Sequence, residues 1–383
     1  MKNAITLLTE IIKTEVFGAP FSPFTLSTEE AIELFRLAKR HELTPIVGNA
    51  VCRKEVDADE RVKDLFEKES FIALYNYEMM TKELETLSSL FESTQIPFMP
   101  LKGAVLRGYY PAPWMRTSGD VDILVNEADH ERAKQIFLAN GYRFEHENDC
   151  HANFVSPSGI LFELHSRLFR KETLPLAAKL LEDPWVHAHP VRDGGYLHAL
   201  SDDVFYLYHV AHLAKHYLNS GCGIRFFLDL WILEQRLPKG SPLRDSMLAD
   251  AGLLAFAKHA KALCGVWFHG DTHSQTTKEM ESYLLSGGIY GSPETNVSVR
   301  YAKRGRKRRY IFNHIFLPYK ALKSVYPVLE KKKWLFPFLQ VRRWCRLIFR
   351  GGGIRAIRHL YQKSVIGSGT RRETLEHLKN LGF

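Results

Sequence analysis

The sequence predicts an α+β protein in which a small mixed sheet with its helices is embedded in largely helical N- and C-terminal regions. Apolar residues recur at three- and four-residue spacing through about the first 95 residues and again from about residue 200. Between these stretches, short apolar runs of strand length alternate with helical segments. We therefore expect four regions: an N-terminal helical region (1–95), a mixed core (96–199), a helical domain (200–290) and a basic, aromatic-rich C-terminal region (300–383).

The composition limits the class of protein. The chain has 383 residues, of which 45% are hydrophobic and 25% charged, and this balance excludes a disordered, collagen-like or multi-span membrane protein. The five cysteines are all more than four residues apart, which excludes zinc ribbons and CxxC motifs. No apolar run has the length of a signal peptide core or of a membrane span. These features predict a cytoplasmic protein with reduced thiols.

The formal net charge of +9 is unevenly distributed along the chain. Residues 300–383 contain 22 Lys and Arg but only three acidic residues, whereas residues 1–299 contain 30 basic and 40 acidic residues. An acidic body therefore carries a basic tail, and the two parts need separate explanations.

The N-terminal region begins with a clear helix signal. Ser27 followed by Glu30 predicts a capping box ahead of an apolar face that runs from Ile32 to Leu37. A second helical pattern extends from about Ala58 to Thr94 with few breaking residues.

The mixed core is predicted from five short apolar runs and one amphipathic helix. The helix runs from about Glu127 to Asn140 and ends at Gly141. The strand-like runs are at 98–101, 120–125, 142–144, 153–156 and 160–164. Helical periodicity returns after Ser201 and continues to about Ser286, and residues 287–299 have the composition of a linker.

The most informative run is Asp-Val-Asp-Ile-Leu-Val at 120–125. In a strand, alternation places Asp120 and Asp122 on one face while the residues between them point into the core. Two adjacent carboxylates repel each other unless a cation neutralises them, and Mg²⁺ prefers such oxygen ligands. A third carboxylate, Glu163 in a later strand-like run, would complete a two-metal site for phosphoryl transfer, with His165 on the same face.

Two segments before this strand carry residues suited to phosphate. Lys102 and Gly103 lie where a strand ends and a short helix begins, so that a phosphate can approach the backbone and the free N–H groups. Lys102 adds a point charge, and Arg116, four residues before Asp120, presents a planar fork of donors.

Together these residues resemble the DNA polymerase beta nucleotidyltransferase superfamily, and more narrowly a bacterial branch of it. The resemblance rests on the Lys-Gly turn, the Arg, the Gly-Asp-Val-Asp-Ile-Leu-Val strand, the helix ending in Asn-Gly-Tyr and the later Glu-Leu-His. It covers about 70 residues, and similarity in the helix HVAHLAKHYLNSGCGIRFFLDLWIL extends it to about residue 235. Ala104 follows Gly103 where the superfamily usually has Ser, and Asp120 lies further downstream than usual.

The resemblance implies a polymerase-beta-like nucleotidyltransferase core that binds Mg²⁺, with two ions expected, and ATP or another nucleoside triphosphate. A nucleoside monophosphate then passes to an acceptor while pyrophosphate leaves. Asp120, Asp122 and Glu163 become the catalytic metal ligands, and Glu163 also helps to deprotonate the acceptor hydroxyl. Lys102 and Gly103 take the place of the superfamily's phosphate-binding turn.

The helical domain offers further polar candidates. Lys215 and Arg225 are expected to contact the nucleotide or the acceptor, and Asp229, four residues after Arg225, is expected to pair with it. His209, His212 and His216 share one helical face, but no acidic residue joins them at a matching spacing. They are therefore expected to be structural or to line a substrate site rather than to bind zinc.

Several alternatives remain open at this level. The basic tail fits a solvated helical surface, a nucleic-acid contact, or a peripheral contact with the inner membrane face through WLFPFLQVRRWCRLIFR. The acceptor can be a sugar phosphate, a lipid-linked glycan, a peptide, a protein side chain or an RNA end. Alternatives for the whole protein are a non-catalytic module that binds nucleotide or polyanion, and an RNA-modifying nucleotidyltransferase.

Overall fold

The computed structural model describes residues 4–20, 22–53, 55–169, 174–219 and 222–287, and in the C-terminal part residues 316–319, 322–323, 326–330, 332–349 and 376–383. The chain forms two compact units, Met1–Gly291 with Gly382, and Ser292–Leu381 with Phe383. The expected linker, apart from residue 287, and the basic cluster at 303–309 lie outside the described residues.

Helices precede the sheet, as the sequence predicts: α1 (Ala4–Phe17), α2 (Thr28–Arg40), α3 (Thr44–Cys52) and α4 (Glu60–Ser93). The capping box is confirmed, because the Ser27 backbone N–H donates to the Glu30 carboxylate and the Glu30 N–H donates to Ser27 Oγ, at 3.1 and 3.3 Å. A short parallel pair, β1 (Phe24–Thr25) with β2 (Val56–Asp57), was not predicted.

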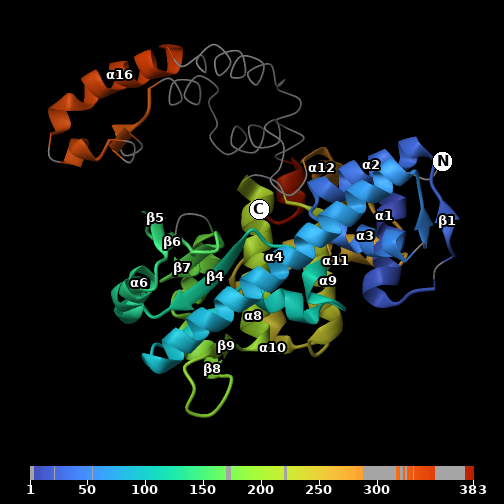
Figure 1. The fold of residues 1–383 in the computed structure, drawn as a ribbon, viewed down its shortest axis with the longest axis horizontal. Helices are drawn as coiled ribbons and strands as arrows, with labels where there is room; N and C mark the ends of the chain where they lie inside the picture. Colours follow the sequence, from blue (N-terminus) through green and yellow to red (C-terminus); the bar gives the residue numbers. More distant parts are fainter. Residues whose placement is uncertain are drawn as a thin grey trace. The chain divides into compact units, whose positions relative to one another are not determined.

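The long helix α4 connects the N-terminal helices to the sheet (Figure 1). Its buried side chains form a narrow stripe with seven-residue spacing at Phe66, Ala73, Met80 and Leu87. Near its start, the Phe66 ring packs edge-on against Phe35 of α2 at 5.0 Å, and near its end Leu87 joins the core beneath the sheet. The first helical region and the mixed core therefore share one continuous element.

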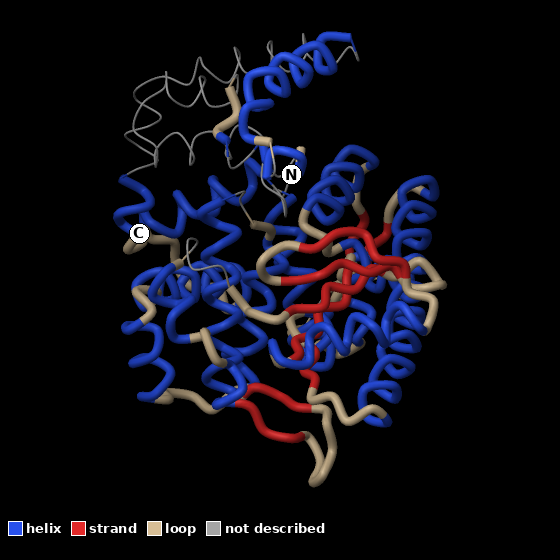
Figure 2. The backbone as a smooth tube through the Cα atoms, turned by 90° about the vertical axis from the view of Figure 1, so that its left-hand side faces the viewer, coloured by secondary structure: helices blue, strands red, loops and turns tan. Residues whose placement is uncertain are grey.

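The central sheet has five strands in the order β3-β4-β7-β6-β5. Only β4 and β7 run parallel, and the other neighbours are antiparallel, so the predicted mixed sheet is confirmed. The strands are β3 (Phe98–Pro100), β4 (Asp120–Val125), β5 (Arg143–Glu147), β6 (His151–Val155) and β7 (Leu161–His165). Figure 2 shows them as one twisted layer between helices.

One face of this sheet is apolar and the other is polar. One face packs against α6 (His130–Ala139) and the end of α4, with Val121 and Ile123 buried and Phe137 stacked on Phe154 at 4.6 Å. The alternation along each strand turns its polar residues to the opposite face. Asp120 and Asp122 of β4 and Glu163 of β7 therefore leave the core and face the helices that follow.

Those helices are α8 (Asp202–Asn219), α9 (Ile224–Arg236), α10 (Pro242–Asp250), α11 (Leu254–Phe268) and α12 (Gln275–Gly287). Most residues of the helix α9 are buried, including the charged residues Arg225 and Asp229 as well as its apolar side chains. Between the sheet and α8 lie α7 (Pro175–Leu180) and a small hairpin of β8 (Ala188–Pro190) and β9 (His198–Leu200). Short 3₁₀ turns occupy Arg107–Tyr109, Pro113–Met115, Glu127–Asp129 and Pro184–His187.

The C-terminal unit has its own small apolar cluster. Leu322, Leu329 and Leu339 are buried together, and Tyr319 donates to the Leu329 carbonyl at 2.6 Å. Its main helix is α16 (Phe336–Phe349), preceded by 3₁₀ turns at Pro327–Glu330 and Lys333–Leu335. Across the part of the chain that the structure describes, no helix has the length and apolar character needed to cross a membrane.

Candidate functional site

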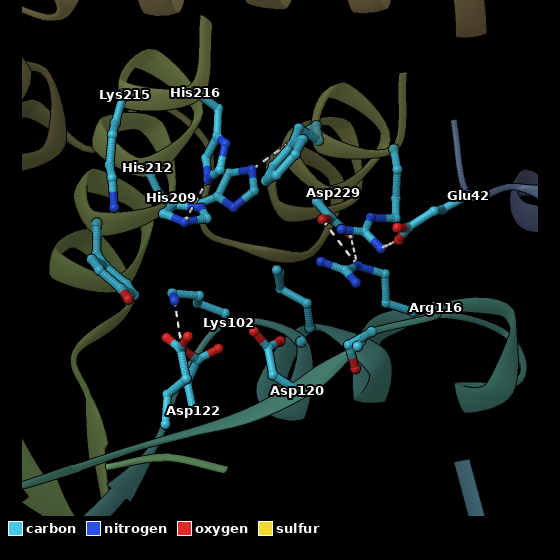
Figure 3. A pocket seen from close by; sticks show the side chains of 18 of the residues that line it. Glu42, Lys102, Arg116, Asp120, Asp122, His209, His212, Lys215, His216 and Asp229 are labelled. Atoms are coloured by element: carbon cyan, nitrogen blue, oxygen red, sulfur yellow. Dashed lines mark hydrogen bonds and ion pairs between the residues drawn. The ribbon is translucent and has the colours of Figure 1, made fainter. Parts of the chain in front are cut away.

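A cavity of about 300 Å³ lies between the polar face of the sheet and the helices α8 and α9 (Figure 3). The sheet side carries carboxylates and a lysine, and the helical side carries histidines, a second lysine and aromatic rings. Nearly all site residues expected from the sequence line it: Lys102, Gly103, Arg116, Asp120, Asp122, Glu163, Lys215 and Arg225.

The three carboxylates come together because β4 and β7 are parallel neighbours. Asp122 is paired directly with Glu163 in the register, and Asp120 lies two residues earlier on the same face. One carboxylate oxygen from each residue lies within 4.8 Å of the others, so the three can hold a metal ion between them. This is the oxygen-rich, hard donor set that Mg²⁺ or Mn²⁺ takes.

Asp122 is the most enclosed of the three carboxylates, with 3% of the residue exposed. It accepts from the Lys102 ammonium at 2.5 Å and lies 2.9 Å from His165 Nε2. Burial alone raises the pKa of Asp122, but Lys102 and His165 outweigh it and hold that pKa below its usual range. Asp122 is therefore ionised at neutral pH, and Lys102 takes the position of its counter-ion.

The pKa of Asp120 is shifted in the opposite direction from that of Asp122. Burial, and then the charge of Asp122, raise the pKa of Asp120 to about 6, although Lys102 partly offsets both. Glu163 has its pKa lowered, because hydrogen bonding from His165 overcomes the effect of burial. The pair on β4 thus has one firmly ionised carboxylate and one that titrates close to neutral pH, as expected for a cluster built to receive a cation.

The turn before α5 (Gly103–Leu106) positions the lysine. Lys102 has φ +46°, a conformation that non-glycine residues rarely adopt. A side chain at Gly103 would be crowded, because a Cβ there would lie 3.1 Å from both Cβ and Oγ of Ser118. From the sequence, Gly103 is expected to let a phosphate approach the backbone. The structure shows in addition that Ser118 lies close to this glycine.

The two arginines form ion pairs in the cavity wall. Arg116 Nε donates to both oxygens of Asp229, at 2.8 and 3.0 Å, and the Tyr110 hydroxyl donates to the same carboxylate at 2.7 Å. Arg225 instead pairs with Glu42 and donates to the Thr117 carbonyl. The expected pairing of Asp229 with Arg225 is therefore wrong, because Arg116 reaches α9 from the loop before β4 and takes that carboxylate.

The helical side of the cavity is formed by one face of α8. His209 Nε2 lies 3.2 Å from the Phe226 carbonyl, and His212 and His216 lie 3.1 Å apart through their Nε2 atoms. Burial lowers the pKa of all three imidazoles, that of His216 to about 4. Within the described residues, the groups of side chains that could hold a metal ion do not include these three histidines.

Sequence reasoning missed several residues of this cavity. His151 of β6 faces β7, with Nε2 3.7 Å from Glu163, and strand alternation from Phe154 was a usable signal for it. Tyr208 precedes the histidines on α8 and lines the cavity, but from the sequence an aromatic residue in a helix is expected to lie in the hydrophobic core. Glu42, in the turn after α2, carried no signal, because its partner Arg225 lies 183 residues later.

The comparisons with known proteins agree with this geometry. Residues 27–269 match a family model described as an uncharacterised nucleotidyltransferase. The matched segment contains the whole cavity, from Glu42 to Asp229. No curated protein matches the chain significantly.

Proposed function

The chain belongs to this family of uncharacterised nucleotidyltransferases, and from that premise we propose that it transfers a nucleoside monophosphate from a nucleoside triphosphate to a hydroxyl acceptor. The single observation that carries the proposal is the meeting of Asp120, Asp122 and Glu163 at the parallel pair of β4 and β7. A divalent cation bound there supplies charge stabilisation at the phosphoryl oxygens and lowers the pKa of the attacking hydroxyl.

The three carboxylates have distinct roles in the proposed transfer. Asp120, Asp122 and Glu163 would hold the cations, two of which fit the proposed phosphoryl transfer, and Glu163 would also accept the proton of the acceptor hydroxyl. The acceptor oxygen forms a bond to the α-phosphorus while the bond from that phosphorus to the β-bridging oxygen breaks. Pyrophosphate is the leaving group, so that atoms and charges balance in one in-line displacement.

The nucleotide contacts follow from the charges around the carboxylates. Lys102 pairs with Asp122, and if a cation bound that carboxylate the ammonium would be free to bind a phosphate oxygen next to the backbone of Gly103. Lys215 and Arg225 lie on the opposite wall, and Arg116 keeps its place through Asp229. His165 orients Asp122 and Glu163, from which it is 2.9 and 3.3 Å away.

Transfer of label tests the proposal directly. Purified protein is incubated with each of four α-labelled triphosphates, Mg²⁺ or Mn²⁺, and fractions that contain glycans, lipids, peptides or RNA. Asp122→Asn should reduce labelling at least about 100-fold, because the amide cannot neutralise a cation. Undiminished labelling by Asp122→Asn would show that the carboxylates are not the catalytic centre.

A binding measurement separates an enzyme from a non-catalytic module. For an enzyme, a triphosphate should raise the unfolding temperature only when a divalent cation is present. A shift that is indifferent to the metal would favour a binding module without activity. Labelled product in the RNA fraction alone would identify an RNA-modifying enzyme.

The C-terminal unit fits a contact at the inner face of the cytoplasmic membrane. Trp334, Phe338 and Val341 are all more than 60% exposed and lie at spacings of four and three residues, on and just before α16. Lys332, Lys333 and Arg342 are exposed beside them. Aromatic rings together with cations are typical of helices that lie in an anionic membrane surface. The acceptor of a cytoplasmic enzyme held in this way would be lipid-linked.

A further inference from the structure

The starting observation is a buried hydroxyl with no partner. Tyr208 is 2% exposed, and its Oη makes no hydrogen bond to any residue that the structure describes. A phenylalanine would fill the same space without burying an unsatisfied polar atom, which destabilises a fold by about 1–3 kcal/mol. A second buried tyrosine on the same helix, Tyr206, is different, because it donates to Glu234 at 2.5 Å.

This hydroxyl lies among the charged groups of the proposed metal and nucleotide site. Tyr208 lines the cavity, and the charged groups that act on its phenol are Lys102 and the carboxylates Asp120, Asp122 and Glu163. The ring packs edge-on against Phe169, with the ring centroids 5.7 Å apart. This contact supports the aromatic ring next to the proposed metal site.

A second group on the same helix also lacks a partner of opposite charge. Lys215 points from α8 towards the side of the cavity that holds Lys102 and Asp122 (Figure 3). Its ammonium lies 6.0 Å from the Phe169 ring centroid, and among the described residues no carboxylate is within ion-pair distance of it. Burial, and then repulsion by Lys102, lower the pKa of Lys215, although the charges of Glu163 and Asp122 partly offset both effects.

Tyr208, His212 and Lys215 are spaced four and three residues apart, so they share one face of α8. The hydroxyl, the imidazole and the ammonium of these three residues line the same cavity, and Lys102 lines it from the sheet side. Several donors converging on one space fit an oxyanion with many acceptor oxygens, once the carboxylates opposite them are neutralised by the proposed cation.

We infer that this face of α8 is a polyphosphate subsite, which binds the β- and γ-phosphates of the triphosphate and then the leaving pyrophosphate. The inference rests on the proposed function and adds to it the position of the leaving group. The Tyr208 hydroxyl is buried, so a phosphate would reach it only after neighbouring side chains move, as Lys102 would if a cation displaced it from Asp122. The α-phosphorus then lies between this subsite and the carboxylates, and the acceptor enters from the remaining side.

Calorimetric titration with inorganic tripolyphosphate and with pyrophosphate, both in Mg²⁺ buffer, tests the subsite without requiring transfer. Tyr208→Phe should weaken tripolyphosphate binding about tenfold, since a hydrogen bond to a charged group is lost. Lys215→Met should weaken it at least as much, and Lys215→Gln is the second variant if the methionine protein folds poorly. Tyr206→Phe is the matched control on the same helix and should bind like the wild type.

Thermal unfolding of the same variants without ligand gives an independent readout. Tyr208→Phe should unfold at the same or a higher temperature than the wild type, whereas Tyr206→Phe should unfold at a lower temperature because it loses the bond to Glu234. A hydroxyl with a purely structural role would instead lower the unfolding temperature on removal and leave tripolyphosphate binding unchanged. That result would overturn the inference.

The outcomes for the subsite and for the proposed function are distinct. Tripolyphosphate binding that is equal in the wild type, Tyr208→Phe and Lys215→Met overturns the subsite, even if labelled nucleotide is transferred. Binding that weakens in both variants supports the subsite, even if no acceptor is ever labelled. A wild-type protein that binds no tripolyphosphate also overturns the subsite, and the transfer assay then decides the proposed function by itself.

Discussion

Arg116 and Asp229 form an ion pair that joins the catalytic strand to the helical domain. The two residues are 113 positions apart, their side chains are 4% and 0% exposed, and Arg116 Nε lies 2.8 Å from Asp229 Oδ1. Tyr110 shares the carboxylate. The pair fixes the loop before β4 against α9, and so sets the distance between the two walls of the cavity.

Breaking this pair should destabilise the protein strongly. Asp229→Ala leaves a buried guanidinium and a buried hydroxyl unpaired, and removal of one partner of a buried ion pair costs about 3–5 kcal/mol of unfolding free energy. Urea denaturation measures this loss. Arg167→Ala is the control, because it removes an exposed pair with Glu127 and should change the unfolding free energy by less than about 1 kcal/mol. Equal effects of the two substitutions would contradict the structural role of the buried pair.

Metal binding should depend on pH through Asp120. The pKa of Asp120 is raised to about 6 by burial and by Asp122, and a cation binds only the ionised carboxylate. The affinity for Mn²⁺ should therefore fall as the pH drops below about 6 and change little above about 7.5. Titration with Mn²⁺, followed by electron paramagnetic resonance, measures the affinity, and an affinity that is constant between pH 5 and 7.5 would contradict the assignment.

The same shift predicts the stability of the metal-free protein. Because the folded-state pKa of Asp120 lies above its unfolded value of 3.8, the folded state binds the proton more tightly. The stabilising contribution of that proton is complete below about pH 4 and is lost as the pH rises through about 6. Asp120→Asn should therefore raise the unfolding free energy by about 1–3 kcal/mol at pH 7.5 in EDTA and have little effect at pH 4. Thermal melts at both pH values in EDTA provide the comparison.

The strand and its carboxylates were predictable because they depend on local rules. The alternation in Asp-Val-Asp-Ile-Leu-Val fixes which side chains leave the core, and the same rule applied to Leu161–His165 gives Glu163 and His165 one face. The position of Lys102 followed from the strand-to-helix turn. Alternation within a strand does not predict which strands are neighbours in the sheet. Asp122 lies opposite Glu163 only because β4 and β7 are parallel neighbours.

The helical wall was predictable only in part. Periodicity placed three histidines on one face of α8, but which residue pairs with Asp229 depends on how a loop 113 positions earlier packs against α9. The Arg225–Glu42 pair likewise depends on the packing of α9 against the turn after α2. Such pairs are set by the tertiary arrangement, and a charge spacing of four residues is a weak guide once stronger partners are available.

The C-terminal unit should bind anionic vesicles through α16 and the turn before it. Sedimentation with vesicles that contain phosphatidylglycerol should recover the protein, and vesicles of phosphatidylcholine alone should recover much less. Replacing both Trp334 and Phe338 with Ala should weaken binding at least about tenfold, since each buried ring contributes on the order of 1.5–3 kcal/mol. Phe71→Ala is the control, because Phe71 is 69% exposed on α4, outside this unit. Recovery by RNA beads instead of vesicles would assign the tail to nucleic acid.

Lys102 should compete with the metal for Asp122. The ammonium lies 2.5 Å from Asp122 Oδ1, and although burial alone lowers the pKa of Lys102, the charge of Asp122 outweighs this and raises it, so the lysine stays charged at any working pH. A cation that binds Oδ1 of Asp122 has to displace this ammonium, and a cation on the other oxygen is repelled by it. Lys102→Met removes the competitor and keeps the length of the side chain, so it should tighten Mn²⁺ binding at pH 8 by about 5- to 30-fold, which corresponds to about 1–2 kcal/mol.

The same substitution should impair nucleotide binding, because the freed ammonium is the group proposed to meet a phosphate. Lys102→Met is therefore expected to bind the metal more tightly and the triphosphate more weakly, two changes of opposite sign in one variant. Loss of a folded loop would weaken both. Lys63→Met is the control, since Lys63 pairs only with Asp57 and Glu60, away from the cavity, and should leave both affinities unchanged. Weaker Mn²⁺ binding by Lys102→Met would show that the lysine supports the metal site and does not compete for it.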